Sequence, residues 1–172
     1  MILMGIDPGS RRCGYGILHV EKNKIIAAGS GIIRLESKGC LEDKLVYLNS
    51  ELQALIEEYK PDVSAVEAIF YGKNIQTAFT LGHVRGVIVF SLKSNGIPVY
   101  SYSPREIKQS VTGNGNASKK QVEYVVQSLL NLKTPAKDDA ADGLAVAVCL
   151  FNRVLGFSQG TQGFLAKNAK TF

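Results

Sequence analysis

The chain has 172 residues, 45% of them hydrophobic and 20% charged, so we expect one globular domain and exclude disordered, collagen-like and coiled-coil chains. Its three cysteines lack CxxC spacing and its two histidines are far apart, which argues against a disulfide framework and against a zinc site. The net charge of +5 is a weak indication of a polyanionic partner.

The first predicted element is a strand over residues 2–7, which ends at the turn sequence DPGS. This start lacks a basic region and reaches Asp7 too early for a signal peptide, and no apolar run is long enough to span a bilayer. We therefore expect a cytoplasmic protein with no membrane partner. Strands are also predicted over 15–20 and 25–35, and the first three strands should form an antiparallel meander.

An apolar stripe at spacings of three and four predicts a helix from Leu41 to a stop near Pro61. A short strand over 62–68 follows, and this strand-helix-strand order implies parallel pairing through a right-handed crossover. A second helix is predicted over about 75–93. Its GHVRG segment either lets another helix approach closely or is tolerated as two helical glycines.

A further strand is predicted over 97–102, and capping boxes at Ser103 and Ser118 should open two more helices. The last helix is predicted over 138–155. We expect residues 1–156 to form the domain and the glycine-rich residues 157–172 to form a flexible tail. This order of elements predicts an α/β protein of the ribonuclease H-like fold, with a five-stranded mixed sheet and helices on both faces.

Four carboxylates stand where a strand or a helix ends: Asp7, Glu67, Asp139 and Asp142. The first two should meet at the carboxyl ends of neighbouring parallel strands, and the last two share one face of the final helix. Gathered acids repel one another, and a hard cation such as Mg²⁺ removes that conflict. Two such ions roughly 4 Å apart can drive phosphodiester hydrolysis without a nucleophilic side chain.

Simpler interpretations exist for single residues. Asp7 before Pro-Gly can shape a turn. Asp138 and Asp139 suit the positive end of a helix dipole, and we prefer that interpretation for Asp138. Basic residues outnumber acids between 101 and 137, so this part of the chain suits phosphates; they are Arg105, Lys108, Lys119, Lys120, Lys133 and Lys137.

At this point the chain resembles the RuvC family of Holliday-junction resolvases. The segment MGIDPGSRRCGYGI resembles the family's GIDPG-x-x-x-x-GYG opening, and VEAIF resembles its E-x-x-F segment. The segments NIQTAFTLGHVRGVIV, REIKQSVTGNGNASKKQV and DDAADGLAVAV resemble three further family stretches. The matches run in order from residue 4 to about 155.

The resemblance implies that the four carboxylates form a magnesium-dependent active site, with Mn²⁺ as a possible substitute. It implies that Phe70 stacks on a junction base and that Lys108 and Lys119 lie near the scissile phosphate. It also implies a homodimer joined through the helix near 75–93, and RuvA and RuvB as branch-migration partners. Gly143 replaces an alanine of the family, and we expect it to loosen the helix that carries Asp142.

Three other functions compete with this one. A ribonuclease H-like enzyme acting on RNA–DNA hybrids needs the same carboxylates but no dimer. An actin-like ATP-binding domain has a similar DPGS loop but needs two domains around its nucleotide. A junction-binding module without chemistry predicts no nicked product and no effect of magnesium on binding.

Overall fold

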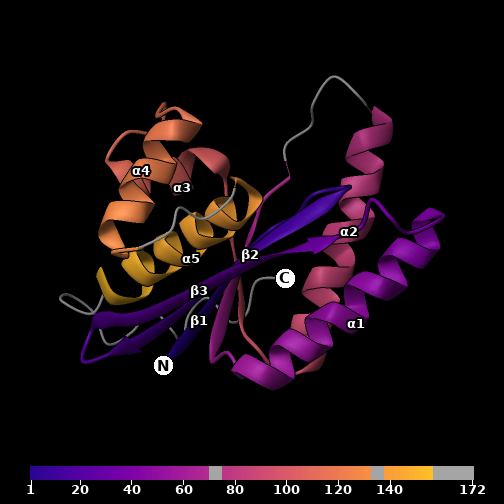
Figure 1. The fold of residues 1–172 in the computed structure, drawn as a ribbon, viewed down its shortest axis with the longest axis horizontal. Helices are drawn as coiled ribbons and strands as arrows, with labels where there is room; N and C mark the ends of the chain where they lie inside the picture. The colour runs from indigo at the N-terminus through magenta and orange to yellow at the C-terminus, as the bar shows by residue number, and fades with distance from the viewer. Residues whose placement is uncertain (70–74, 133–137, 157–172) are drawn as a thin grey trace.

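The computed structural model describes residues 1–69, 75–132 and 138–156, which form a sheet with helices on both sides (Figure 1). The elements in chain order are β1 (Ile2–Asp7), β2 (Arg12–Glu21), β3 (Lys24–Arg34), α1 (Leu41–Tyr59), β4 (Val63–Glu67), α2 (Ile75–Ser94), β5 (Val99–Tyr102), α3 (Pro104–Thr112), α4 (Lys119–Leu129) and α5 (Asp138–Gly156). The predicted tail lies outside the described residues.

The five strands form one mixed sheet in the order β3-β2-β1-β4-β5. Strands β1, β2 and β3 pair antiparallel, whereas β1, β4 and β5 pair parallel. The predicted α/β class, the antiparallel meander and the parallel crossover are therefore confirmed.

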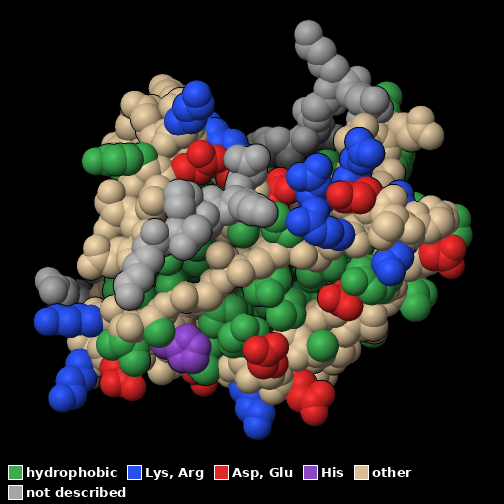
Figure 2. Space-filling view, in the orientation of Figure 1, with side chains coloured by type: hydrophobic (Ala, Val, Ile, Leu, Met, Phe, Trp, Pro, Cys, Tyr) green, Lys and Arg blue, Asp and Glu red, His purple; other side chains and the backbone are tan. Residues whose placement is uncertain are grey.

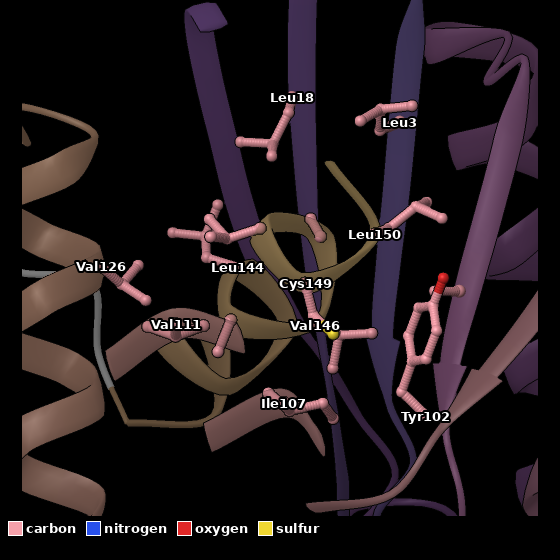
Figure 3. Packing of buried hydrophobic residues seen from close by; sticks show 14 of the residues in the cluster. Leu3, Leu18, Tyr102, Ile107, Val111, Val126, Leu144, Val146, Cys149 and Leu150 are labelled. Carbon is pink, nitrogen blue, oxygen red and sulfur yellow. The ribbon is translucent and has the colours of Figure 1, made fainter. Parts of the chain in front are cut away.

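Successive strand residues point to opposite faces, and this alternation divides the core in two. On one face Leu3 and Ala65 pack with α3, α4 and α5, as Figure 3 shows for part of this cluster. On the other face Met4 and Val66 pack with α1 and α2. The expectation of helices on both faces is confirmed, and the molecule has three layers.

Local chemistry explains several element ends. Lys22 and Asn23, between β2 and β3, both have left-handed backbone angles, φ 48° and 61°, which suit the turn of a tight hairpin. Both predicted capping boxes are present, because Ser103 and Ser118 each accept a hydrogen bond from the backbone of the third helical residue. Helix α1 ends at Tyr59, and its capping residue Lys60 comes immediately before Pro61.

Helix α5 lies unusually close to the sheet because glycines line the contact. A Cβ atom at Gly16 would lie 2.6 Å from the Leu144 backbone, and one at Gly143 would lie 2.5 Å from the Tyr15 backbone. The expectation that Gly143 loosens the helix stays a prediction. The absence of a side chain at Gly143 lets α5 pack directly on β2. This close packing fixes the position of the helix relative to the strand ends.

Helix α2 corrects another expectation. Eighteen consecutive residues of this 20-residue helix have a mean hydropathy of 1.2, so by length and composition alone the helix could cross a membrane, although the sequence analysis expected no such run. The helix nevertheless makes polar contacts with its own domain. Arg85 donates to Ser101 Oγ at 3.0 Å, and Ser91 Oγ lies 2.8 Å from Asn49 Oδ1 on α1. These contacts hold α2 on the sheet as a surface helix.

Candidate active site

Two of the predicted carboxylates lie side by side at one edge of the sheet. Ile6 of β1 pairs with Val66 of parallel strand β4, and Asp7 and Glu67 follow them directly. Parallel strands end at the same edge, so both side chains stand at the carboxyl end of the sheet, where α/β proteins place their ligand sites.

The start of α5 brings the other two carboxylates to the same edge. Gly14 pairs with Asp7 across β1 and β2, and the space that a Gly14 side chain would need is filled by the Asp139 carbonyl group. Asp142 lies one helical turn further along. The negative charges of both helical aspartates act on Asp7, which confirms that these groups are neighbours in space.

Burial and mutual repulsion change the protonation of this cluster. Burial, followed by repulsion from Asp142, raises the pKa of Asp7 from 3.8 to about 7, while the Lys119 charge opposes the rise. Burial, followed by repulsion from Asp7 and Asp142, raises the pKa of Glu67 from 4.5 to about 8. Two half-buried carboxyl groups whose pKa values are raised to about 7 and 8 indicate a place that favours positive charge.

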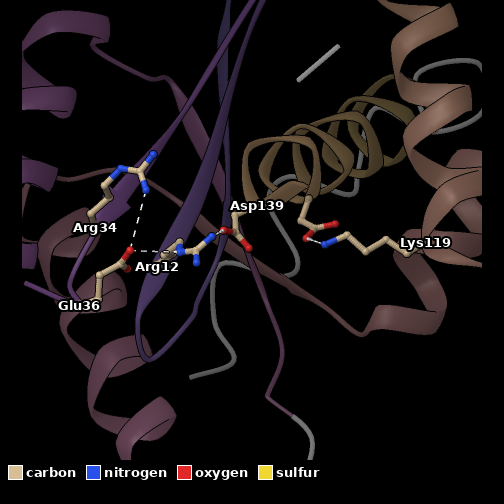
Figure 4. A network of polar contacts seen from close by, with 6 residues as sticks. Arg12, Arg34, Glu36, Lys119 and Asp139 are labelled. Atoms are coloured by element: carbon tan, nitrogen blue, oxygen red, sulfur yellow. Dashed lines mark hydrogen bonds and ion pairs between the residues drawn. The ribbon is translucent and has the colours of Figure 1, made fainter. Parts of the chain in front are cut away.

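Two basic side chains supply part of that charge (Figure 4). The ammonium group of Lys119, the first residue of α4, lies 2.7 Å from Asp142 Oδ2. The guanidinium group of Arg12, at the start of β2, lies 3.3 Å from Asp139 Oδ2. Arg12 also contacts Glu36, with 3.4 Å between Nε and Oε1, and Arg34 lies 3.9 Å from the same oxygen.

Among the described residues, no three His, Cys, Asp or Glu side chains are arranged closely enough to hold a metal ion. Asp139 faces Arg12, and Asp142 faces Lys119. The donors still fit a hard divalent cation, since all are carboxylate oxygens and two already bind a positive group. The assignment of the four acids as metal ligands stays a prediction.

The other predicted residues lie at different distances from this cluster. Lys108, on α3, lies close enough for its charge to oppose the rise in the pKa of Glu67. Arg105 packs its stem against Gly115 in the loop after α3, and Lys120 is exposed on α4. Phe70 lies outside the described residues. Sequence reasoning missed Arg12 and Glu36, because nothing local to either residue indicates the partner that it meets.

The sheet order and the acidic edge define the class of this protein, a ribonuclease H-like nuclease fold. Comparison with known proteins gives the family. The family model for "Crossover junction endodeoxyribonuclease RuvC" matches residues 3–150. The chain therefore belongs to the RuvC family, whose nucleases are metal-dependent.

Relatives and solved structures agree with this membership. The crossover junction endodeoxyribonuclease RuvC of Petrotoga mobilis is 45% identical over 150 residues, which cover 87% of this chain and 92% of the relative. The Thermus thermophilus RuvC structure matches with a TM-score of 0.80 and 27% identity, covering 91% of this chain and 97% of that one. T. thermophilus RuvC in complex with a Holliday junction substrate matches with a TM-score of 0.82 and 26% identity, covering 91% and 96%.

Proposed function

We propose that this chain is a structure-selective endonuclease that resolves Holliday junctions in DNA recombination and repair, by metal-dependent hydrolysis of phosphodiester bonds. The observation that carries the proposal is the meeting of Asp7 and Glu67 with the start of α5 at one edge of the sheet. A relative whose structure contains a Holliday junction shares this fold, which supports a four-way junction as the substrate.

We assign the metal ligands to Asp7, Glu67, Asp139 and Asp142. Oxygen donors in this number suit two Mg²⁺ ions, with Mn²⁺ as a substitute. The bound metal would supply the Lewis acidity that activates water and stabilises the leaving oxygen. The protein's own part is to hold these oxygens together at a fixed edge of the sheet. A hydrolytic water then makes a protein nucleophile unnecessary.

Basic and aromatic side chains would position the DNA. Lys119 already lies 2.7 Å from Asp142 and Lys108 acts on Glu67, so both are placed to meet a phosphate at the cleavage point. We assign weaker backbone contacts to Arg105 and Lys120, which are exposed beside them. Phe70, three residues beyond Glu67, would stack on a junction base, a contact worth roughly 1–3 kcal/mol.

A junction with two-fold symmetry calls for two active sites in one assembly, so we propose a homodimer. An apolar groove along α2 supports this, because its wall includes Phe79, Gly82, Gly86 and Phe90 from that helix and Leu45 from α1. Nothing lies within 4 Å of a Cβ placed at either glycine, which leaves room for a second helix. Membership of the RuvC family supports the proposal of RuvA and RuvB as partners and of the cytoplasm as location.

The decisive test is Asp7→Asn on a labelled synthetic four-way junction. We expect this change to abolish magnesium-dependent nicking and to leave junction binding in place, because it removes an oxygen ligand without adding bulk. Glu57→Gln, on exposed α1, is a matched charge-removing control that should cut normally. Normal cleavage by Asp7→Asn would refute the site.

The substrate is tested with the same protein. A four-way junction should be nicked symmetrically, whereas an RNA–DNA hybrid should remain intact. Preferred cleavage of the hybrid would favour the ribonuclease H-like alternative. Junction binding without any nicked product in the presence of magnesium would favour a binding module.

A further inference from the structure

Arg12 makes a contact for which the proposed reaction gives no role. Its Nη1 atom lies 3.3 Å from Asp139 Oδ2, and its side chain is 48% exposed where β2 begins. Asp139 is one of the proposed metal ligands. A permanently charged guanidinium group therefore rests on an oxygen that the metal would need.

The position of Arg12 is held from its other side. Its Nε atom lies 3.4 Å from Glu36 Oε1, and Arg34 lies 3.9 Å from the same oxygen. Figure 4 shows the chain of contacts from Arg34 through Glu36 and Arg12 to Asp139. Glu36 therefore holds the guanidinium group beside the site by a contact that does not involve Asp139.

We infer that Arg12 is a positioning residue, an internal counter-ion that holds Asp139 and competes with a divalent cation for its carboxylate. This inference rests on the proposed function, because it takes Asp139 as a metal ligand. The guanidinium group at 3.3 Å stabilises the Asp139 carboxylate before metal binds. When a metal ion binds the same oxygen, either the attraction between Arg12 and Asp139 is lost or the repulsion between Arg12 and the metal ion must be overcome.

The two possible roles of Arg12 predict opposite changes in metal affinity when Arg12 is removed. If Arg12 only anchors the start of α5, removing it should weaken metal binding, since Asp139 would lose its orientation. If Arg12 competes, removing it should strengthen metal binding. An exposed ion pair shifts such an equilibrium by about two- to fivefold.

The experiment is a Mn²⁺ titration of the full chain without DNA, followed by the electron paramagnetic resonance signal of free Mn²⁺ in 0.15 M salt. Arg12→Gln should bind Mn²⁺ about two- to fivefold more tightly than wild type. Arg34→Gln removes the same charge but contacts only Glu36 in this network, so it should bind like wild type. Arg12→Lys keeps the charge and should also bind like wild type. Thermal unfolding establishes that each variant is folded.

A double-mutant cycle separates the two proposals. In an Asp139→Asn background, Arg12→Gln should change Mn²⁺ affinity much less than in wild type, because the charged oxygen for which Arg12 competes is gone and only the repulsion between Arg12 and the metal ion remains. Unchanged or weaker binding by Arg12→Gln, while Asp7→Asn and Asp139→Asn both weaken binding, would overturn this inference and leave the proposed function standing. If neither aspartate variant weakens Mn²⁺ binding, the proposed function fails and this inference fails with it.

Discussion

Asp7 and Glu67 show how single residues prepare this site. Each lies at the end of a buried strand, and without metal each retains a proton near neutral pH because burial and neighbouring acids oppose its charge. A divalent cation would reverse that preference, since it stabilises the charged forms together. Metal binding at the proposed site would therefore release protons, and it should strengthen as pH rises through the range of about 7 to 8.

The metal-free protein should become less stable as pH rises. The pKa of Asp7 is raised from 3.8 to about 7, and that of Glu67 from 4.5 to about 8, so between these limits the folded chain holds protons that the unfolded chain has lost. The free energy of unfolding should thus fall from about pH 4 to about pH 8 and level off above that range.

Asp7→Asn should reduce this loss of unfolding free energy with rising pH, because asparagine mimics the protonated acid. We expect the variant to be more stable than wild type at pH 8 by on the order of 2 kcal/mol, since one pKa unit corresponds to about 1.4 kcal/mol. Urea denaturation in EDTA at pH 5 and pH 8 measures the difference. Glu57→Gln should show the same fall in the free energy of unfolding between pH 5 and pH 8 as wild type. An equal fall in Asp7→Asn would contradict this prediction.

The sequence located these acids but not their partners. Asp7 and Glu67 could be placed because each ends a strand, and parallel strands end at one edge. Asp139 and Asp142 could be placed on one helix face from their spacing. The pairing of Arg12 with Asp139 joins residues 127 positions apart through side chains alone, and no periodicity encodes such a contact.

Among the elements, α5 decides where its two aspartates stand. It packs on β1 and β2 through Gly5, Gly14 and Gly16, and its own Gly143 faces β2. These glycines come from separate segments, so the close approach was invisible in the sequence, whereas strand alternation and capping boxes predicted the elements themselves. Boundaries shifted where local signals were weak: β2 begins at Arg12 instead of residue 15, and β5 at Val99 instead of residue 97.

Gly16→Ala tests whether this packing positions the site. Its Cβ would lie 2.6 Å from the Leu144 backbone, which cannot move without lifting α5. We expect a loss of about 3 kcal/mol in the free energy of unfolding, and a larger loss of cleavage than of junction binding. Gly29→Ala on β3 meets nothing within 4 Å and should stay within about 1 kcal/mol of wild type. Equal stability of the two variants would show that α5 has room to move.

At the scale of the whole molecule, α2 presents an apolar surface that its own domain does not cover. Ile75, Phe79 and Phe90 are 71%, 67% and 68% exposed on this one helix. An exposed patch of this kind marks a partner or a membrane. The contacts of Arg85 with Ser101 and of Ser91 with Asn49 tie the opposite side of α2 to the domain, so a span across a bilayer would require breaking them. The proposed homodimer would cover the patch without that cost.

A charge placed on this surface should therefore separate the two copies. We expect Phe79→Asp and Phe90→Asp to elute as monomers where wild type is a dimer, because a carboxylate buried in an apolar contact loses its hydration. The control is Tyr124→Asp on α4, which replaces an aromatic side chain of similar exposure, 71%, away from α2. Analytical ultracentrifugation measures the mass, and a junction assay counts paired nicks.

The monomers should keep the carboxylate site but lose paired cutting, since two strands then need two independent encounters. A wild-type monomer that still cuts both strands together would show that symmetry in the junction does not require symmetry in the enzyme.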